Sequence, residues 1–205
     1  MRRAGGGRSA DAIGRDAGLH PRGRAMASRE EKVQLLRCKM RTYPDFPKPG
    51  VTFQDICPIL KDPNAFRATI DLFEEHLKEN CPLPDLVVGL DARGFLFGPV
   101  VAQRLGIGFV PIRKKGKLPG PIISVEFSSE YAKGELEIQC GAVESGQKVV
   151  VIDDLLATGG TLSAACELLK KVNAETRECL VVIELKALNG LQKLGCVPCY
   201  SILQY

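Results

Sequence analysis

The chain has 205 residues, which is long enough for one domain with a buried core that needs neither disulfides nor a metal. Hydrophobic residues make up 45% and charged residues 25%, as in an average globular protein. No apolar run approaches the ~20 residues that a membrane span needs. These features predict a soluble globular protein and argue against a membrane protein.

The net charge of +4 is concentrated at the start of the chain, because residues 1–25 hold six arginines and two aspartates. The remaining residues carry 22 basic and 22 acidic side chains, so nucleic-acid binding is not expected of the domain. Residues 1–27 are rich in Gly and Arg and poor in large apolar side chains, which predicts a disordered leader. RNA binding through this leader stays open as an accessory activity, and translation could start at Met1 or Met26.

Residues 28–205 are predicted to form one domain. Three prolines in the segment YPDFPKPG, residues 43–50, favour an extended loop. A helix is predicted to begin after Asp62, because this N-cap residue is followed by a proline and by apolar residues at helical spacing.

Five short runs predict buried parallel strands, because they are rich in Val, Ile and Leu without strict alternation. They are Leu86–Leu90, Gly108–Ile112, Lys148–Ile152, Leu180–Leu185 and Tyr200–Leu203. Further helices are predicted at Phe95–Leu105, Leu162–Val172 and Ala187–Leu194. This alternation predicts an α/β fold with a doubly wound, mainly parallel five-stranded sheet.

Residues 113–147 interrupt the alternation. Within them, Ile122–Phe127 and Glu135–Gln139 are predicted to pair as an antiparallel hairpin, preceded by a basic loop. Long irregular insertions of this kind are commonly lids or binding loops.

Eight cysteines occur, several of them inside apolar runs. Only Cys196 and Cys199 form a CxxC pair, and no second pair completes a zinc site. Reduced thiols in a cytoplasmic protein are therefore expected.

The string from Val149 to Thr161 carries the strongest chemical signal. Its apolar strand delivers Asp153 and Asp154 to the edge where open α/β sheets bind ligands, and a glycine-containing loop and a helix start follow. Backbone N–H groups and the threonine hydroxyls there can bind a phosphate, whereas carboxylates suit the hydroxyl groups of a sugar. The string therefore predicts a sugar phosphate site, and no Walker or dinucleotide glycine motif is present.

This string, DDLLATGGT in particular, resembles the phosphoribosyl-pyrophosphate signature of type I phosphoribosyltransferases, in their adenine branch. The similarity extends over roughly residues 30–205 and includes YPDFPKPGVTF, GLDARGFLFGP, IRKKGKLPGP, SEYAKGELEIQ and SILQY. The resemblance implies the fold of that family, with a small hood at about residues 28–60, a flexible loop at about residues 113–135, and a homodimer.

The resemblance also implies roles for individual residues. Asp153 and Asp154 would hold the ribose hydroxyls. The 5′-phosphate would lie in a cradle of Ala157, Thr158, Gly159, Gly160 and Thr161. Pyrophosphate would be bound by Asp91, Ala92 and Arg93, in a loop that often has a non-proline cis peptide, and by Arg113, Lys114 and Lys117. Arg113 could serve the neighbouring subunit.

Adenine would contact Val51, Phe53 and Gln54, where the family commonly has arginine at the last position. Glu130 and Tyr131 match the catalytic pair of the flexible loop. The implied reaction joins adenine to 5-phosphoribosyl 1-pyrophosphate and yields AMP and pyrophosphate. Mg²⁺ is the expected cofactor, held by substrate oxygens and water and not by metal ligands of the chain.

Two alternatives stay open: a regulatory protein that binds phosphoribosyl pyrophosphate without catalysis, and a transferase for another purine base. Glu130, Tyr131 and the basic loop favour an enzyme, because a sensor needs none of them.

Overall fold

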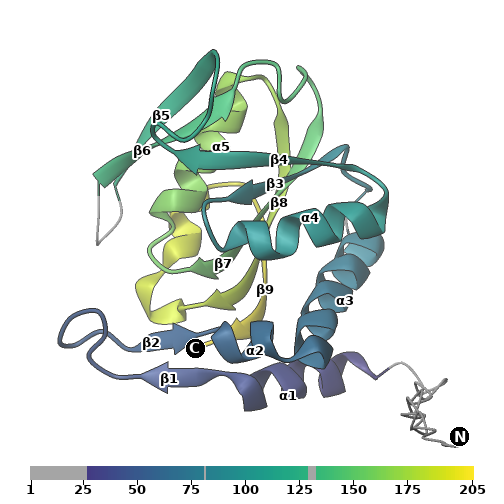
Figure 1. Cartoon of the computed structure of the whole chain (residues 1–205), viewed down its shortest axis with the longest axis vertical. Helices are drawn as coiled ribbons and strands as arrows, with labels where there is room; N and C mark the ends of the chain where they lie inside the picture. Colours follow the sequence, from purple (N-terminus) through teal and green to yellow (C-terminus); the bar gives the residue numbers. More distant parts are fainter. Residues whose placement is uncertain (1–26, 81, 129–132) are drawn as a thin grey trace, which may run out of the picture.

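A seven-stranded sheet forms the centre of the computed structural model, which describes residues 27–80, 82–128 and 133–205 (Figure 1). The strand order is β5-β6-β4-β3-β7-β8-β9. Five neighbouring strands are parallel: β4 (Gly108–Lys114), β3 (Leu86–Leu90), β7 (Lys148–Leu156), β8 (Glu175–Glu184) and β9 (Cys199–Gln204). The antiparallel hairpin consists of β5 (Ile122–Ser128) and β6 (Lys133–Gln139). The predicted disordered leader lies, apart from residue 27, outside the described residues.

The five predicted parallel strands and the predicted hairpin are confirmed. The sheet nevertheless has seven strands where five were predicted, because β4 continues to Lys114 and its outer edge pairs with β6. Strand β7 also runs on to Leu156, so Asp153 and Asp154 lie within it and not after it. Pairing with β8 as far as Glu184 supports this extension.

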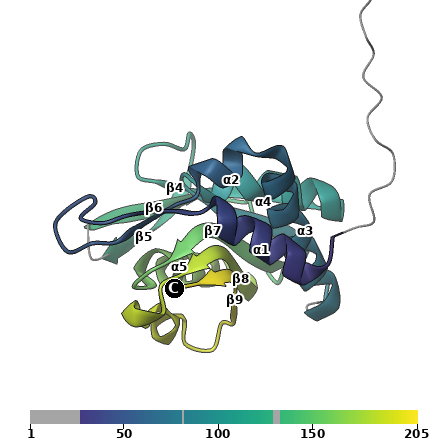
Figure 2. The ribbon, with the colours of Figure 1, turned by 90° about the horizontal axis from the view of Figure 1, so that it is seen from below.

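Helices cover both faces of the sheet, with α3 and α4 on one side and α5 on the other (Figures 1 and 2). Alternate residues of β7 divide accordingly: Val150 and Ile152 pack toward α3 and α4, and Val149 and Val151 pack toward α5. The helices are α3 (Pro63–Asn80), α4 (Gly94–Leu105) and α5 (Gly160–Lys171). In the described part of the chain, no helix is long and apolar enough to cross a membrane.

The helix start predicted at Asp62 is confirmed, because its carboxylate accepts hydrogen bonds from the backbone N–H groups of Asn64 and Ala65. The helix predicted at Ala187–Leu194 is wrong in type. Two short 3₁₀ turns replace it, η1 (Lys186–Leu188) and η2 (Gly190–Leu194). Between them Asn189 has φ 50°, a left-handed conformation that interrupts a helix.

An N-terminal layer, residues 28–61, lies outside the main sheet, in the region where the resemblance implies a hood. It contains α1 (Arg29–Lys39), β1 (Arg41–Tyr43), β2 (Phe53–Asp55) and α2 (Cys57–Lys61). Strands β1 and β2 pair as an antiparallel ribbon, and α1 packs on α3.

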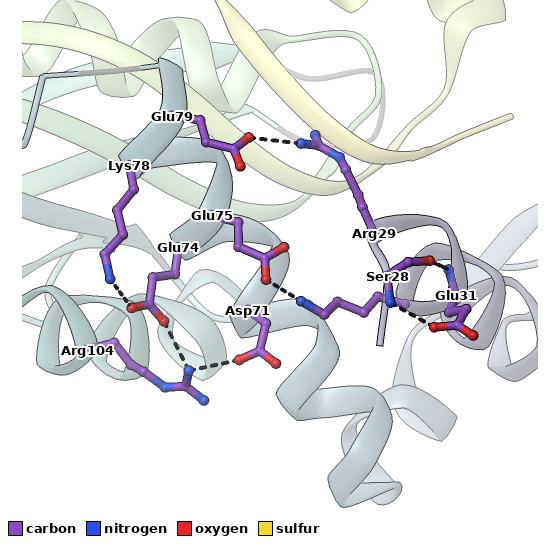
Figure 3. A network of polar contacts seen from close by, with 10 residues as sticks. Ser28, Arg29, Glu31, Asp71, Glu74, Glu75, Lys78, Glu79 and Arg104 are labelled. Carbon is purple, nitrogen blue, oxygen red and sulfur yellow. Dashed lines mark hydrogen bonds and ion pairs between the residues drawn. The ribbon is translucent and has the colours of Figure 1, made fainter. Parts of the chain in front are cut away.

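Ion pairs join α1, α3 and α4 (Figure 3). The buried Lys32 of α1 pairs with Glu75 of α3. Arg104 of α4 donates to Asp71 at 2.8 Å and to Glu74 at 3.0 Å, both on α3. At the start of α1, Ser28 and Glu31 exchange hydrogen bonds in a capping box, which fixes where the helix begins.

The pair of Lys32 and Glu75 generates a stability prediction. Glu75→Gln leaves the ammonium of Lys32 buried without its carboxylate, so we expect the free energy of unfolding to fall by about 1–3 kcal/mol. Lys32→Met replaces the charge by an apolar chain of similar length and is expected to change it by less than about 1 kcal/mol. Chemical denaturation measures both, with Lys78→Met on the exposed face of α3 as the control. Equal losses in the first two variants would contradict the prediction.

Candidate functional site

The predicted sugar phosphate residues gather where β3, β4 and β7 end at one edge of the sheet. The loop after β3 lies against β7, because a Cβ atom at Gly94 would overlap the carbonyl oxygen of Ile152. From the same loop, Arg93 Nε donates a hydrogen bond to Asp154 Oδ2. Two segments about 60 residues apart in sequence thus form one surface.

The peptide bond between Asp91 and Ala92 is cis, as the resemblance implies. The side chain of Asp91 is only 6% exposed and lies at the end of β3. Its carboxylate accepts a hydrogen bond from Arg113 Nε at 3.2 Å and lies 3.6 Å from Lys117 Nζ. One buried carboxylate therefore orients two cations, Arg113 near the end of β4 and Lys117 in the loop that follows it.

The basic side chains between Arg113 and Lys117 have different surroundings. Arg113 lies with its guanidinium 5.9 Å from the ring centroid of Phe95, which steadies it beside the loop after β3. Lys115 points elsewhere, since it pairs with Glu135 of the hairpin. Lys114, at the end of β4, is exposed.

Asp153 and Asp154 have different surroundings. Asp154 is 6% exposed and is paired with Arg93, and its backbone N–H donates to Asp153 Oδ1 at 2.9 Å. Burial, followed by the negative charge of Asp154, raises the pKa of the Asp153 carboxyl well above its usual range. Asp153 would therefore gain most from a ligand that donates hydrogen bonds, such as a sugar hydroxyl.

The pKa of Arg93 responds to the same pair of acids. Burial acts to lower it, but the charges of Asp154 and Asp153 outweigh burial and raise the pKa of the guanidinium. Arg93 therefore keeps its positive charge at this edge of the sheet.

The loop after β7 lies tightly against η2. Gly159 has φ 78°, and a Cβ atom on it would overlap the carbonyl oxygen of Gly190. A Cβ atom on Gly190 would in turn overlap the carbonyl oxygen of Ala157. No side chain of the described residues caps the start of α5, so its first N–H groups, around Gly160 and Thr161, are available to an anion. Thr158 completes this loop and is partly exposed.

The predicted base-contacting residues lie on and before β2 in the N-terminal layer. The rings of Phe53 and Phe46 pack edge to face, with centroids 5.0 Å apart. Val51 is partly buried at the preceding turn, and its carbonyl accepts from the backbone N–H of Phe46. Gln54 Oε1 accepts a hydrogen bond from Thr42 Oγ1 at 2.9 Å, so its side chain is engaged within the ribbon.

The start of α2 links this layer to the loop after β3. The hydrogen bond to Asp55, followed by burial, raises the pKa of the Cys57 thiol, while the nearby Arg93 acts to lower it. The charges of Cys57 and Arg93 therefore influence each other.

Glu130 and Tyr131 lie outside the described residues, between β5 and β6. Glu137 supports the candidate site and was not predicted from the sequence. Its carboxylate is 2% exposed and accepts a hydrogen bond from the backbone N–H of Gly116 at 2.8 Å, which holds the basic turn. Its position opposite Arg113 depends on strand register, for which the sequence carries no local signal. Gly190 was also missed, although the pair Asn189-Gly190 is a typical turn signal.

The raised pKa of Asp153 generates a prediction on stability. The folded chain binds this proton more tightly than the unfolded chain, so the carboxyl makes stability fall as pH rises from about 4 toward the raised pKa. Asp153→Asn keeps an oxygen acceptor and removes the ionisation. We expect the Tm of this variant to exceed that of the parent chain by about 2–4 °C at pH 8, about 1 kcal/mol. The difference should shrink toward pH 4.

Thermal melts at pH 4, 6 and 8 test this, with Glu126→Gln, an exposed carboxylate on β5, as the control. A lower Tm for Asp153→Asn at pH 8, or a difference that does not vary with pH, would contradict the assignment.

Comparison with known proteins identifies the family. The protein-family model described as "Phosphoribosyl transferase domain" matches residues 58–200 of this chain. Adenine phosphoribosyltransferase of Rattus norvegicus is 58% identical over 177 residues, which cover 86% of this chain and 98% of that protein. The protein of the same name from Homo sapiens is 56% identical with the same coverage.

Solved structures agree with these sequence comparisons. Adenine phosphoribosyltransferase of Saccharomyces cerevisiae, complexed with an imino-altritol bisphosphate and adenine, has a TM-score of 0.81 and 41% identity over 84% of this chain and 99% of that chain. The Giardia lamblia enzyme complexed with 9-deazaadenine has a TM-score of 0.78 and 37% identity over 84% and 97%. The chain therefore belongs to the adenine phosphoribosyltransferases of the type I phosphoribosyltransferase family.

Proposed function

We propose that this chain transfers the phosphoribosyl group of 5-phosphoribosyl 1-pyrophosphate to adenine, which yields AMP and pyrophosphate and salvages the purine. The observation that carries the proposal is the contact of Arg93 with Asp154. It places a candidate pyrophosphate loop beside candidate ribose carboxylates, next to an uncapped helix start. The identity with curated adenine phosphoribosyltransferases supports adenine as the base.

The ribose 5-phosphate part of the substrate is assigned to β7 and the loop after it. Asp153 and Asp154 accept hydrogen bonds from the 2′- and 3′-hydroxyls, which suits the unfavourable surroundings of the Asp153 carboxylate. The 5′-phosphate is held by backbone N–H groups and hydroxyls of the cradle, which consists of Ala157, Thr158, Gly159, Gly160 and Thr161.

Pyrophosphate is assigned to the loop after β3 and to the basic loop. Asp91, Ala92 and Arg93 offer backbone donors, and the cations are Arg113, Lys114 and Lys117. The buried carboxylate of Asp91 holds Arg113 and Lys117 at the end of β4. Positive groups that are already in place stabilise the charge that develops on the leaving pyrophosphate.

Adenine is assigned to Val51, Phe53 and Gln54, with the ring of Phe53 stacking on the purine. The relatives from Saccharomyces cerevisiae and Giardia lamblia were solved with adenine and 9-deazaadenine. Because the Gln54 side chain is bonded to Thr42, we assign its contact with the base to the backbone. The exchange of the family's arginine for glutamine is then of little consequence.

Glu130 is assigned a proton exchange with the purine while N9 attacks C1′ and pyrophosphate leaves from the opposite face. Tyr131 accompanies it in the same loop. Both assignments rest on the resemblance, since the two residues lie outside the described part of the chain. The loop at about residues 113–135 is assigned as a lid that keeps water from the oxocarbenium-like centre at C1′.

The residues at this site fit Mg²⁺ only as a companion of the substrate. In the ranges that the structure describes, no three His, Cys, Asp or Glu side chains are disposed to hold a metal. Asp154 is already paired with Arg93. Mg²⁺ that arrives with the oxygens of the substrate would supply charge neutralisation there, beside Arg113, Lys114 and Lys117.

The assembly and the compartment are also proposed here. A homodimer follows from the family resemblance. A reducing compartment such as the cytoplasm suits the seven described cysteines, which are free thiols.

The function is tested by incubating the purified chain with Mg²⁺, phosphoribosyl pyrophosphate and adenine, hypoxanthine, guanine or xanthine, and by following nucleotide formation. We expect AMP from adenine and no product from the other bases. Product from another base alone would overturn the assignment of the base. Binding of phosphoribosyl pyrophosphate without any product would favour the regulatory alternative.

The two lysines of the basic loop should differ in effect. Lys117→Ala removes a cation that Asp91 orients toward the pyrophosphate, so we expect the KM for phosphoribosyl pyrophosphate to rise about tenfold, or about 1.5 kcal/mol. Lys115→Ala removes a cation that pairs with Glu135 and is expected to change this KM less than about twofold. Steady-state kinetics with adenine saturating compares the two variants. A larger effect at Lys115 would reverse the assignment.

A further inference from the structure

Helix α5 packs on β8 (Figure 1), and three cysteines belong to the apolar cluster between them. Cys166 lies in α5 and is partly exposed, whereas Cys179 lies in β8 and is fully buried. Their Sγ atoms are 3.8 Å apart. Cys199 of β9 is the register neighbour of Cys179 in the sheet. The proposed reaction uses none of these thiols.

The geometry of Cys166 and Cys179 suits a disulfide. A disulfide brings its sulfur atoms to about 2.05 Å, so the two sulfurs need to close about 1.8 Å, which side-chain rotation and a small shift of α5 can supply. Cys199 is placed differently, because it faces Cys179 only as a neighbour across parallel strands. The contact between α5 and β8 therefore identifies Cys166 and Cys179 as the pair suited to a disulfide.

The two thiols also differ in their tendency to ionise. The hydrogen bond with Cys179 lowers the pKa of Cys166, although burial acts against it. The same hydrogen bond, followed by burial, raises the pKa of Cys179 well above its usual range. Burial raises the pKa of Cys199 to about 12. Cys166 is thus the accessible and more readily ionised partner, and Cys179 is a buried thiol in contact with it.

We propose that Cys166 and Cys179 form a redox modification site, at which a peroxide converts the two thiols into an intrachain disulfide. The Cys166 thiolate attacks one peroxide oxygen, so that an S–O bond forms, the O–O bond breaks and hydroxide leaves. The Cys179 sulfur then attacks the Cys166 sulfur, the S–S bond forms and the S–O bond breaks. The protons of the two thiols convert the departing hydroxides to water. Two thiols are oxidised and one hydrogen peroxide is reduced to two waters.

The disulfide would fasten α5 to β8. Cys166 lies six residues after Gly160, about 9 Å along the helix whose start forms the candidate phosphate cradle. Joining the two elements restricts the unfolded chain and should raise the Tm. A thiol reductant restores the parent state.

The test uses the full chain, treated with hydrogen peroxide under native conditions, alkylated with N-ethylmaleimide and digested with trypsin. Cleavage after Lys170 and Arg177 puts Cys166 and Cys179 on different peptides. We expect a linked pair of these peptides, its loss with dithiothreitol, and a rise in Tm of several degrees. Cys166→Ser should abolish the linked pair, and Cys199→Ser, the matched control, should retain it.

Other results would overturn the proposal. These are Cys166 oxidised beyond the sulfenic acid with Cys179 still a free thiol, a link from Cys179 to Cys199, or a link that forms only after denaturant is added. Circular dichroism checks that each variant is folded. Cys166→Ala serves as a second variant if Cys166→Ser is not folded, and a peroxide-induced rise in Tm of the same size in either variant as in the parent chain would equally contradict the assignment.

Discussion

The close approach of the start of α4 to β7 is the constraint on which the rest of the site depends. Gly94 leaves no room for a Cβ atom against the carbonyl oxygen of Ile152, and Arg93 beside it reaches Asp154. Because this close approach involves backbone atoms, the start of α4 cannot move away from β7 without also separating Arg93 from Asp154. The candidate pyrophosphate loop and the candidate ribose carboxylates therefore keep a fixed position relative to each other.

The charged side chains at this junction favour a site with a bound ligand over an empty site. Arg93 neutralises Asp154, whereas Asp153 is partly buried, and this burial, followed by the negative charge of Asp154, raises the pKa of its carboxyl. Asp91 meanwhile holds Arg113 and Lys117 in place. A carboxylate whose pKa is raised in this way is costly to the free protein, and a ligand that donates hydrogen bonds to it would offset that cost. Stability and function therefore oppose each other at Asp153.

The remaining structure supports this junction from two sides. Ion pairs of α1, α3 and α4 join the N-terminal layer to the helix that starts at Gly94 (Figure 3). On the other face, α5 begins at the candidate phosphate cradle and contacts β8 through Cys166 and Cys179. Both helices that begin at the site are thus fastened at a distance from it.

The sequence by itself determined the elements and the chemistry that depend on near neighbours along the chain. The five apolar strands, the helix start at Asp62 and the order of strand, glycine loop and helix around Asp153 could be predicted, because periodicity, caps and glycine loops are local signals. Only the tertiary structure decided that β6 pairs with β4, that Glu137 holds Gly116, and that Cys166 contacts Cys179. These contacts depend on strand register and packing between distant segments, which no local pattern encodes.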